Sequence, residues 1–229
     1  MRPEFQTFGI SHLVALVLTF GLPILASWMA AGNREGLTAR IWAWLFSMVI
    51  FLNRLAYLVY DLESGRPWFD QIPIHVCDIA GITTICALIL RNDRCFEIGY
   101  FWGLAGTVQA LITPDLAHGF PDPHFFLFFV GHGGIVSGVL FGALGLRLKI
   151  APRSILRATL WLYVYAGVVG VVDAMLGVNY GYLCGKPGEA SLLDLLGPWP
   201  FYIFVLAAIA PLFFAIFYLP YFVRDRLRE

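Results

Sequence analysis

The sequence predicts an all-α, polytopic membrane protein with seven transmembrane helices in one domain covering residues 1–229. The hydrophobic fraction is 59% and the charged fraction only 13%, whereas soluble domains carry about 25% charged residues. The mean hydropathy is +0.76. Apolar runs of about 20 residues, the length needed to span a bilayer, recur along the chain. Together these features predict an integral membrane protein.

The apolar runs give seven predicted spans, which are 8–30, 41–61, 71–91, 96–113, 123–147, 155–178 and 197–222. The first is longer than the core of a signal peptide, so we expect it to be retained. Pro73 and Pro123 stand at helix starts, where a missing N–H costs little. Pro23 and Pro211 lie inside spans and are expected to kink them.

Lys and Arg are divided unequally between the two sides of the predicted bundle. The side that holds the N-terminus has three of them, Arg2, Arg66 and Lys186. The other side has eleven, which are Arg34, Arg40, Arg91, Arg94, Arg147, Lys149, Arg153, Arg157, Arg224, Arg226 and Arg228. Because cytoplasmic loops carry an excess of Lys and Arg, we predict an external N-terminus and a cytoplasmic C-terminus.

Strongly polar residues inside the spans fall at one depth, in the outer half of the predicted bundle. They are Asn53, Arg54, His75, Cys77, Asp78, Gln109, His124, His132 and Asp173. With a rise of about 1.5 Å per residue, Cys77 lies roughly 9 Å and His132 roughly 13 Å below the outer helix ends. Polar groups in hydrocarbon usually face a bundle interior or a wet cavity, so we predict one water-accessible cavity here. The outer loops, including the one that carries Tyr180, are either a partial lid or interface anchors.

Cys77 is the candidate nucleophile of this cavity, although most membrane cysteines are small buried hydrophobes. A thiol acts as a nucleophile after a base or a positive neighbour stabilises the thiolate. His132, His124 and Arg54 lie at matching depth on other spans. His75 is two positions away on the same helix and is expected to point elsewhere.

Two further pairs are candidates for structural or chemical roles. His75 and Asp78 share a helix face, which fits a structural hydrogen-bonded pair, half of a metal site, or a carboxylate that orients an imidazole. Arg54 and Asp173 are predicted to form an ion pair, since neither charge is stable alone in the membrane. The Arg54 guanidinium also suits a lipid phosphate or carboxylate.

Other features exclude some functions. The net charge is zero, so no global basic field suggests a nucleic-acid partner. The cysteines, Cys77, Cys86, Cys95 and Cys184, form no CxxC pair, which argues against a metal ribbon or a redox dithiol. We predict no cofactor. Gly134, Gly138 and Gly142 repeat every four residues, which is typical of close helix packing.

Several short motifs occur in order along most of the chain. They are Cys77-Asp78, Gly103-Leu-Ala-Gly, Gln109-Ala-Leu-Ile-Thr-Pro-Asp115, His132, Asn179-Tyr-Gly-Tyr-Leu, Lys186-Pro and Leu196-Gly-Pro-Trp-Pro-Phe-Tyr202. This combination resembles the YwaF-type bacterial integral membrane proteins, and is similar at a distance to the eukaryotic transmembrane-protein-164 family. That family consists of acyltransferases for ether-linked phosphatidylethanolamine that use a cysteine and a histidine. The resemblance implies a bacterial inner-membrane protein whose cysteine is Cys77 and whose histidine is His132. It departs at Asp78, where the eukaryotic proteins are expected to have a histidine.

The first functional hypothesis is therefore a lipid acyltransferase or acyl hydrolase whose partner is a membrane phospholipid or another acyl lipid. Cys77 attacks an ester or thioester carbonyl, and His132 transfers the proton. The predicted substrate-binding residues are Asn53, Arg54, His75, Asp78, Gln109, His124, Asp173 and Tyr180, of which Asn53 or Gln109 could donate to the oxyanion.

Two alternatives remain open. One is a non-catalytic transporter component or small-ligand receptor, in which Asp173 and the histidines bind a solute or relay protons. The other is a zinc-dependent intramembrane amide hydrolase with His75, Asp78, His124 and His132 near the metal.

Overall fold

The computed structural model describes residues 3–63, 65 and 67–227, and every regular element among them is helical. The α-helices are α1 (Ile10–Ala30), α2 (Leu37–Glu63), α3 (Val76–Leu90), α4 (Asp93–Trp102), α5 (Val108–Ile112), α6 (Pro123–Leu144), α7 (Arg153–Leu176) and α8 (Phe201–Arg226). Short 3-10 turns are η1 (Trp68–Asp70), η3 (Tyr180–Tyr182) and η4 (Leu192–Leu196), and η2 (Gly103–Thr107) is a π-helix. Arg2, Arg66 and Arg228 of the charge count lie outside the described residues.

Five of the described helices, α1, α2, α6, α7 and α8, are long and apolar enough to cross a membrane. The other two predicted spans are less regular. Helix α3 has only 15 residues, because the first part of the predicted span, residues 71–75, is not helical. The fourth span consists of α4 and α5 joined by the π-helical turn η2. The structure therefore supports a multi-pass helical protein, while the count of seven spans remains a prediction.

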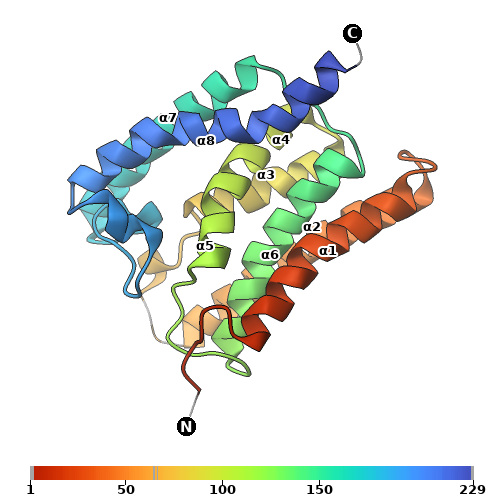
Figure 1. Cartoon of the computed structure of the whole chain (residues 1–229). Coiled ribbons are helices and arrows are strands. Elements are labelled where there is room, and N and C mark those ends of the chain that lie inside the picture. Colours follow the sequence, from red (N-terminus) through yellow and green to blue (C-terminus); the bar gives the residue numbers. More distant parts are fainter. Residues whose placement is uncertain (1–2, 64, 66, 228–229) are drawn as a thin grey trace.

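The helices are arranged in two groups with a third between them (Figure 1). Helices α1, α2 and α6 pack against one another on one side. Helices α7 and α8 form a hairpin on the other side, and α3, α4 and α5 fill the space between. About two thirds of the apolar stretch of α6 is buried, against 11% of that of α8. Helix α6 is therefore the centre of the fold, and α8 lies at its edge.

Glycines allow the helices to approach closely around α6, as the four-residue repeat predicted. A Cβ on Gly138 would lie 2.9 Å from the Thr84 side chain of α3. A Cβ on Gly142 would lie 2.6 Å from Phe96 of α4. Neither distance is tolerated by carbon atoms, so these positions require glycine and the prediction of a packing role is confirmed.

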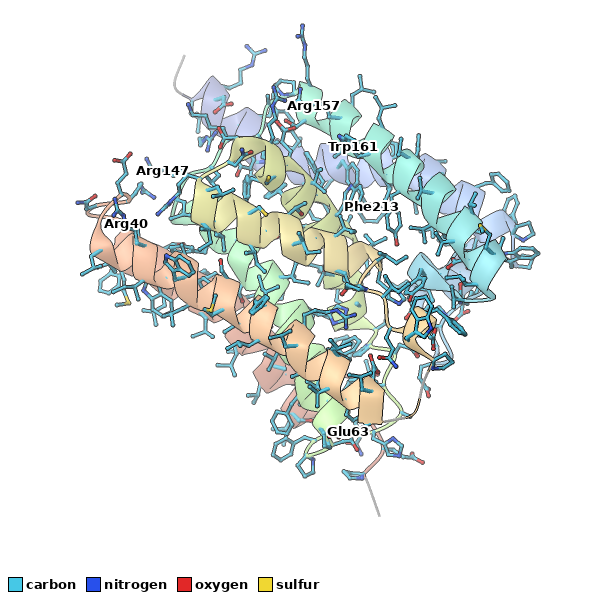
Figure 2. All side chains as sticks on the ribbon, turned by 180° about the vertical axis from the view of Figure 1, so that it is seen from behind. Arg40, Glu63, Arg147, Arg157, Trp161 and Phe213 are labelled. Carbon is cyan, nitrogen blue, oxygen red and sulfur yellow. The ribbon has the colours of Figure 1, made fainter. Side chains whose placement is uncertain are left out.

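Basic residues gather at one end of the molecule, which we call the basic end. Figure 2 shows Arg40, Arg147 and Arg157 on that side and Glu63 at the opposite end of α2. At the basic end the Arg34 guanidinium donates hydrogen bonds to the carbonyls of Leu144 (2.9 Å) and Gly145 (2.7 Å), where α6 finishes. This arginine therefore satisfies carbonyls that a helix C-terminus leaves without partners.

The tight contact between α3 and α4 yields a stability prediction. A Cβ on Gly99 would lie 2.7 Å from Thr84 Oγ1 and 3.2 Å from the Thr84 backbone nitrogen. Because backbone cannot rotate away, we expect Gly99→Ala to lower the free energy of unfolding by about 1–3 kcal/mol. Gly167→Ala on α7, where nothing lies within 4 Å, is the control and should be neutral or stabilising through helix propensity. Apparent melting temperatures in one detergent test both, and equal values for the two variants would contradict the packing.

Candidate functional site

Tyr180 holds the non-helical segment that precedes α3. Its side chain is buried, its hydroxyl donates to the Phe69 carbonyl (2.7 Å), and it accepts the Ile72 N–H (2.9 Å). The backbone N–H of Tyr180 in turn donates to Asp173 Oδ1 of α7 (2.9 Å). The loop after α7 is therefore fastened both to α7 and to the chain that leads into α3.

Arg54 of α2 is paired with Asp78 and not with Asp173, which corrects the ion pair predicted from the sequence. Arg54 Nε lies 3.4 Å from Asp78 Oδ1, and Arg54 Nη2 donates to the Gln71 carbonyl (2.8 Å). The other oxygen of Asp78 accepts the backbone N–H of His75 (3.0 Å). Asp78 therefore caps the first turn of α3 and at the same time holds that turn against α2.

The His75 imidazole is held by the outer loop. Its Nδ1 accepts the backbone N–H of Gly181 (3.2 Å), and its ring meets that of Tyr180 edge-on at 4.9 Å. Because Nδ1 is an acceptor, the neutral ring carries its proton on Nε2. Gly181 has a φ of +61°, and a Cβ there would lie 2.8 Å from the Tyr165 hydroxyl. Glycine is therefore required at this contact for both its backbone conformation and its size.

Cys77 is the second residue of α3 and is half-buried. The Cys77 thiol lies at the N-terminus of this helix, and its neighbour in the chain is the Asp78 carboxylate, which opposes a negative charge on the sulfur. The opening turn of a helix stabilises negative charge because its N–H groups point outward. With these opposing influences, a base is needed to take the proton when the thiol reacts.

Three tyrosines lie around the start of α3: Tyr165 and Tyr182 contact Ile74 and His75 there, and Tyr57 is on the face of α2 that carries Arg54. The Tyr165 hydroxyl donates to the Ile74 carbonyl at 2.8 Å. The Tyr57 hydroxyl makes no hydrogen bond within the described residues, so it is the one able to donate to a ligand.

Sequence reasoning assigned none of these three tyrosines to the site, although Tyr182 is part of the motif Asn179-Tyr-Gly-Tyr-Leu. Tyr57 follows Arg54 by three positions on α2, a spacing that puts two side chains on one helix face. That spacing is the signal that could have found it.

Tyr182 belongs to the loop after α7 and donates its hydroxyl to Asp115 Oδ2 at 3.2 Å. Burial first, and then the neighbouring Asp115 carboxylate, raise the pKa of Tyr182 above its ordinary value. The hydroxyl therefore keeps its proton and stays a donor. Tyr202 at the start of α8 donates to the Tyr182 carbonyl. The loop after α7 is thus tied to two other segments, and its role as a partial lid stays a prediction.

His132 lies on α6, outside hydrogen-bonding contact with Cys77. Its ring stacks on Phe128 at 4.2 Å, and its Nδ1 lies 3.0 Å from the Phe128 carbonyl. Since a carbonyl only accepts, Nδ1 carries the proton and Nε2 has a free lone pair. His132 and His75 are therefore opposite tautomers, one with an accepting Nε2 and one with a donating Nε2.

His124, Asn53 and Gln109 were also predicted to belong to the site. His124 stacks on Tyr60 (5.7 Å) and meets Tyr57 edge-on (5.9 Å), so it reaches the site through Tyr57. Asn53 Nδ2 donates to the Leu127 carbonyl (3.0 Å), and its side chain lines a separate apolar groove between α2 and α6. The Gln109 side chain makes no hydrogen bond within residues 3–63, 65 and 67–227.

The zinc alternative has no ligand set in the described part of the chain. Within it, no three side chains among His, Cys, Asp and Glu lie close enough to hold one metal ion. The His75 Nδ1 and one Asp78 oxygen are already engaged with backbone N–H groups.

Comparison with known proteins decides the family. The model of the TMEM164 family matches residues 7–218, which include every site residue described above. The chain belongs to the TMEM164 family. It is 28% identical over 173 residues to an uncharacterized protein of Treponema pallidum (strain Nichols), covering 76% of this chain and 71% of that protein. No solved structure matches the chain. The sequence-based assignment to this family is confirmed.

The partner of Arg54 can be tested with a double-mutant cycle. We expect Arg54→Gln and Asp78→Asn each to lower stability, because each leaves a partly buried charge without its partner. The double variant should lose less than the sum of the two, with a coupling of about 0.5–3 kcal/mol. Thermal or denaturant unfolding in detergent gives these values. The same cycle with Asp173→Asn is the control and should be additive, whereas coupling to Asp173 alone would contradict the observed pairing.

Proposed function

We propose that this member of the TMEM164 family is a membrane-embedded acyltransferase or acyl hydrolase with Cys77 as its nucleophile. The observation that carries the proposal is the position of Cys77 in the first turn of α3, at a helix N-terminus and next to the residue that pairs with the Arg54 guanidinium. The N–H groups of a helix N-terminus stabilise both a thiolate and the oxyanion that forms on a carbonyl. Family membership is compatible with a lipid-related function in the membrane.

The proposed reaction has two steps. The Cys77 thiol gives its proton to a base while its sulfur attacks the ester carbonyl of a phospholipid. The C–O bond then breaks, the leaving alcohol takes the proton back, and the acyl group remains on Cys77 as a thioester. In the second step a lysolipid hydroxyl or water attacks the thioester, which gives a new ester or a free acid and restores the thiol.

His132 is the proposed base because its Nε2 carries a lone pair. The Nδ1–H bond to the Phe128 carbonyl fixes this tautomer in the way a carboxylate or carbonyl fixes catalytic histidines elsewhere. His75 has its proton on Nε2 and is unsuited to the same role without a change of tautomer. Catalysis by this base requires the His132 ring and the Cys77 sulfur to come together in the complex with substrate.

Tyr57 is the proposed donor to the oxyanion. Tyr57 lies on the face of α2 that carries Arg54, and its hydroxyl has no hydrogen-bond partner within the described residues, whereas Asn53 belongs to a separate groove. The Arg54 side chain is 31% exposed, and its contacts with other described residues are those of Nε with Asp78 and of Nη2 with the Gln71 carbonyl. Its Nη1 remains to hold a lipid phosphate. Asp173 and Tyr180 then position the loop over the site and do not contact the substrate.

We also propose that the basic end faces the cytoplasm of a bacterial cell, with Cys77 in the outer half of the inner membrane. Loops that carry most of the Lys and Arg normally stay inside, and the matched relative is bacterial. Ester carbonyls of phospholipids lie at the top of the hydrocarbon, which is the depth predicted for Cys77.

The experiment that tests this proposal is acyl transfer or release from a phospholipid labelled in its acyl chain, with purified protein in nanodiscs. We expect Cys77→Ser to lose turnover and the trapped thioester, and His132→Ala to reduce turnover by about 10²–10⁴-fold. The matched control is Cys184→Ser, which removes an exposed thiol in the loop after α7. This variant should keep full activity. Undiminished turnover in Cys77→Ser would rule out the thiol mechanism.

The substitution Tyr57→Phe distinguishes hydrogen-bond donation to the oxyanion by the hydroxyl from a packing role of the ring. The phenyl ring keeps its contact with His124, so we expect normal expression and melting temperature but a fall in kcat of about 10²-fold. Tyr60→Phe also faces His124 and is the control, expected to leave kcat unchanged. Equal kcat values for the two variants would remove Tyr57 from the mechanism.

A further inference from the structure

A cavity lies at the basic end, away from Cys77. It has a volume of about 220 Å³ and is walled by α3, α4 and α7. Its lining is mostly apolar, with Ile98, Ala158, Trp161 and Cys95 among the residues. An apolar cavity that opens on the membrane-facing side of a helix bundle can accept part of a lipid chain.

Two arginines share one carboxylate at this cavity. Arg157 donates to both oxygens of Glu97 (2.8 and 2.6 Å), and Arg94 Nη1 lies 3.4 Å from the same carboxylate. The Glu97 side chain is 8% exposed, whereas that of Arg94 is 69% exposed. Two guanidinium groups and one carboxylate leave a net charge of +1. A buried glutamate thus holds two arginines in place beside the cavity without neutralising both.

Trp161 follows Arg157 by four residues on α7, and both residues line the cavity. Figure 2 shows both toward the basic end of that helix. Residues at this spacing share a helix face, and the Trp161 ring lies about 6 Å deeper along the axis. Trp161 Nε1 makes no hydrogen bond within the described residues. A lipid phosphate at the arginines would therefore bring its ester carbonyls to the level of the indole N–H, where tryptophan commonly lies in membranes.

We propose that this cavity binds one anionic phospholipid from the leaflet at the basic end. The phosphate contacts Arg94 and Arg157, the ester region reaches Trp161, and the first part of a chain enters among Ile98 and Ala158. Charge complementarity favours an anionic lipid over a zwitterionic one, because the cavity carries a net positive charge. The proposal does not depend on the Cys77 chemistry, which concerns the opposite end of the bundle.

The test uses the full chain in phosphatidylcholine nanodiscs with added phosphatidylglycerol whose chains are brominated near the carboxyl end. Bromine quenches a nearby indole, and the Trp161 signal is obtained as the difference from Trp161→Phe. We expect brominated phosphatidylglycerol to quench Trp161 with an affinity about fivefold higher than brominated phosphatidylcholine, as one uncompensated charge predicts.

Arg94→Gln removes the uncompensated charge, so we expect the preference to fall to about one while the fold stays intact, because this side chain is mostly exposed. Arg147→Gln removes one positive charge from the same end at a residue that does not line the cavity, and should keep the preference. Equal quenching by the two brominated lipids in the unsubstituted protein would overturn the proposal. Equal loss in the two variants would also overturn it, since that result means attraction to the surface as a whole.

Discussion

The Arg54–Asp78 ion pair is the contact on which the arrangement of the candidate site depends. Asp78 receives the His75 N–H and the Arg54 guanidinium on its two oxygens, and Arg54 also binds the Gln71 carbonyl. This single pair therefore sets where α3 begins and holds that beginning against α2. Charges inside a membrane protein persist only when they are paired or hydrated, so the interaction is also what allows both residues to be there.

Much of the fold follows from the sequence, because bilayer thickness requires long apolar helices. The helices α1, α2, α6, α7 and α8 match predicted spans within a few residues at most ends. The start of α3 does not, since the apolar run begins at 71 and the helix at Val76. The non-helical residues before Val76 are stabilised by the distant side chains Tyr180, Tyr165 and Arg54. Irregular backbone is tolerated at membrane depth only where protein groups bond its N–H and C=O groups. The pattern of apolar residues in the run does not indicate which distant side chains those partners are.

The site residues named from the sequence stay a prediction, and the pairing predicted for Arg54 was wrong. Depth along each span correctly brought Arg54 near residues of α3, since rise per residue is fixed. It could not choose between Asp78 and Asp173 as the partner, because both lie at that depth and rotation about each helix axis is unknown from sequence. The structure shows that Asp173 receives the Tyr180 N–H instead. Tyr57 was not predicted, because a tyrosine in an apolar run is most often an interface anchor.

The late start of α3 changes the chemistry available to Cys77. Had the helix begun at 71, the N–H groups around the thiol would all bond to carbonyls of the preceding turn, and the sulfur would lie beside a saturated backbone. With the start at Val76, Cys77 is in the first turn, where the chain before the helix offers no preceding turn of carbonyls. The side chains of Tyr180, Tyr165 and Arg54, which bind the backbone before Val76, thus place the thiol at a helix N-terminus. The irregular backbone before α3 and the proposed reactivity of Cys77 share one structural cause.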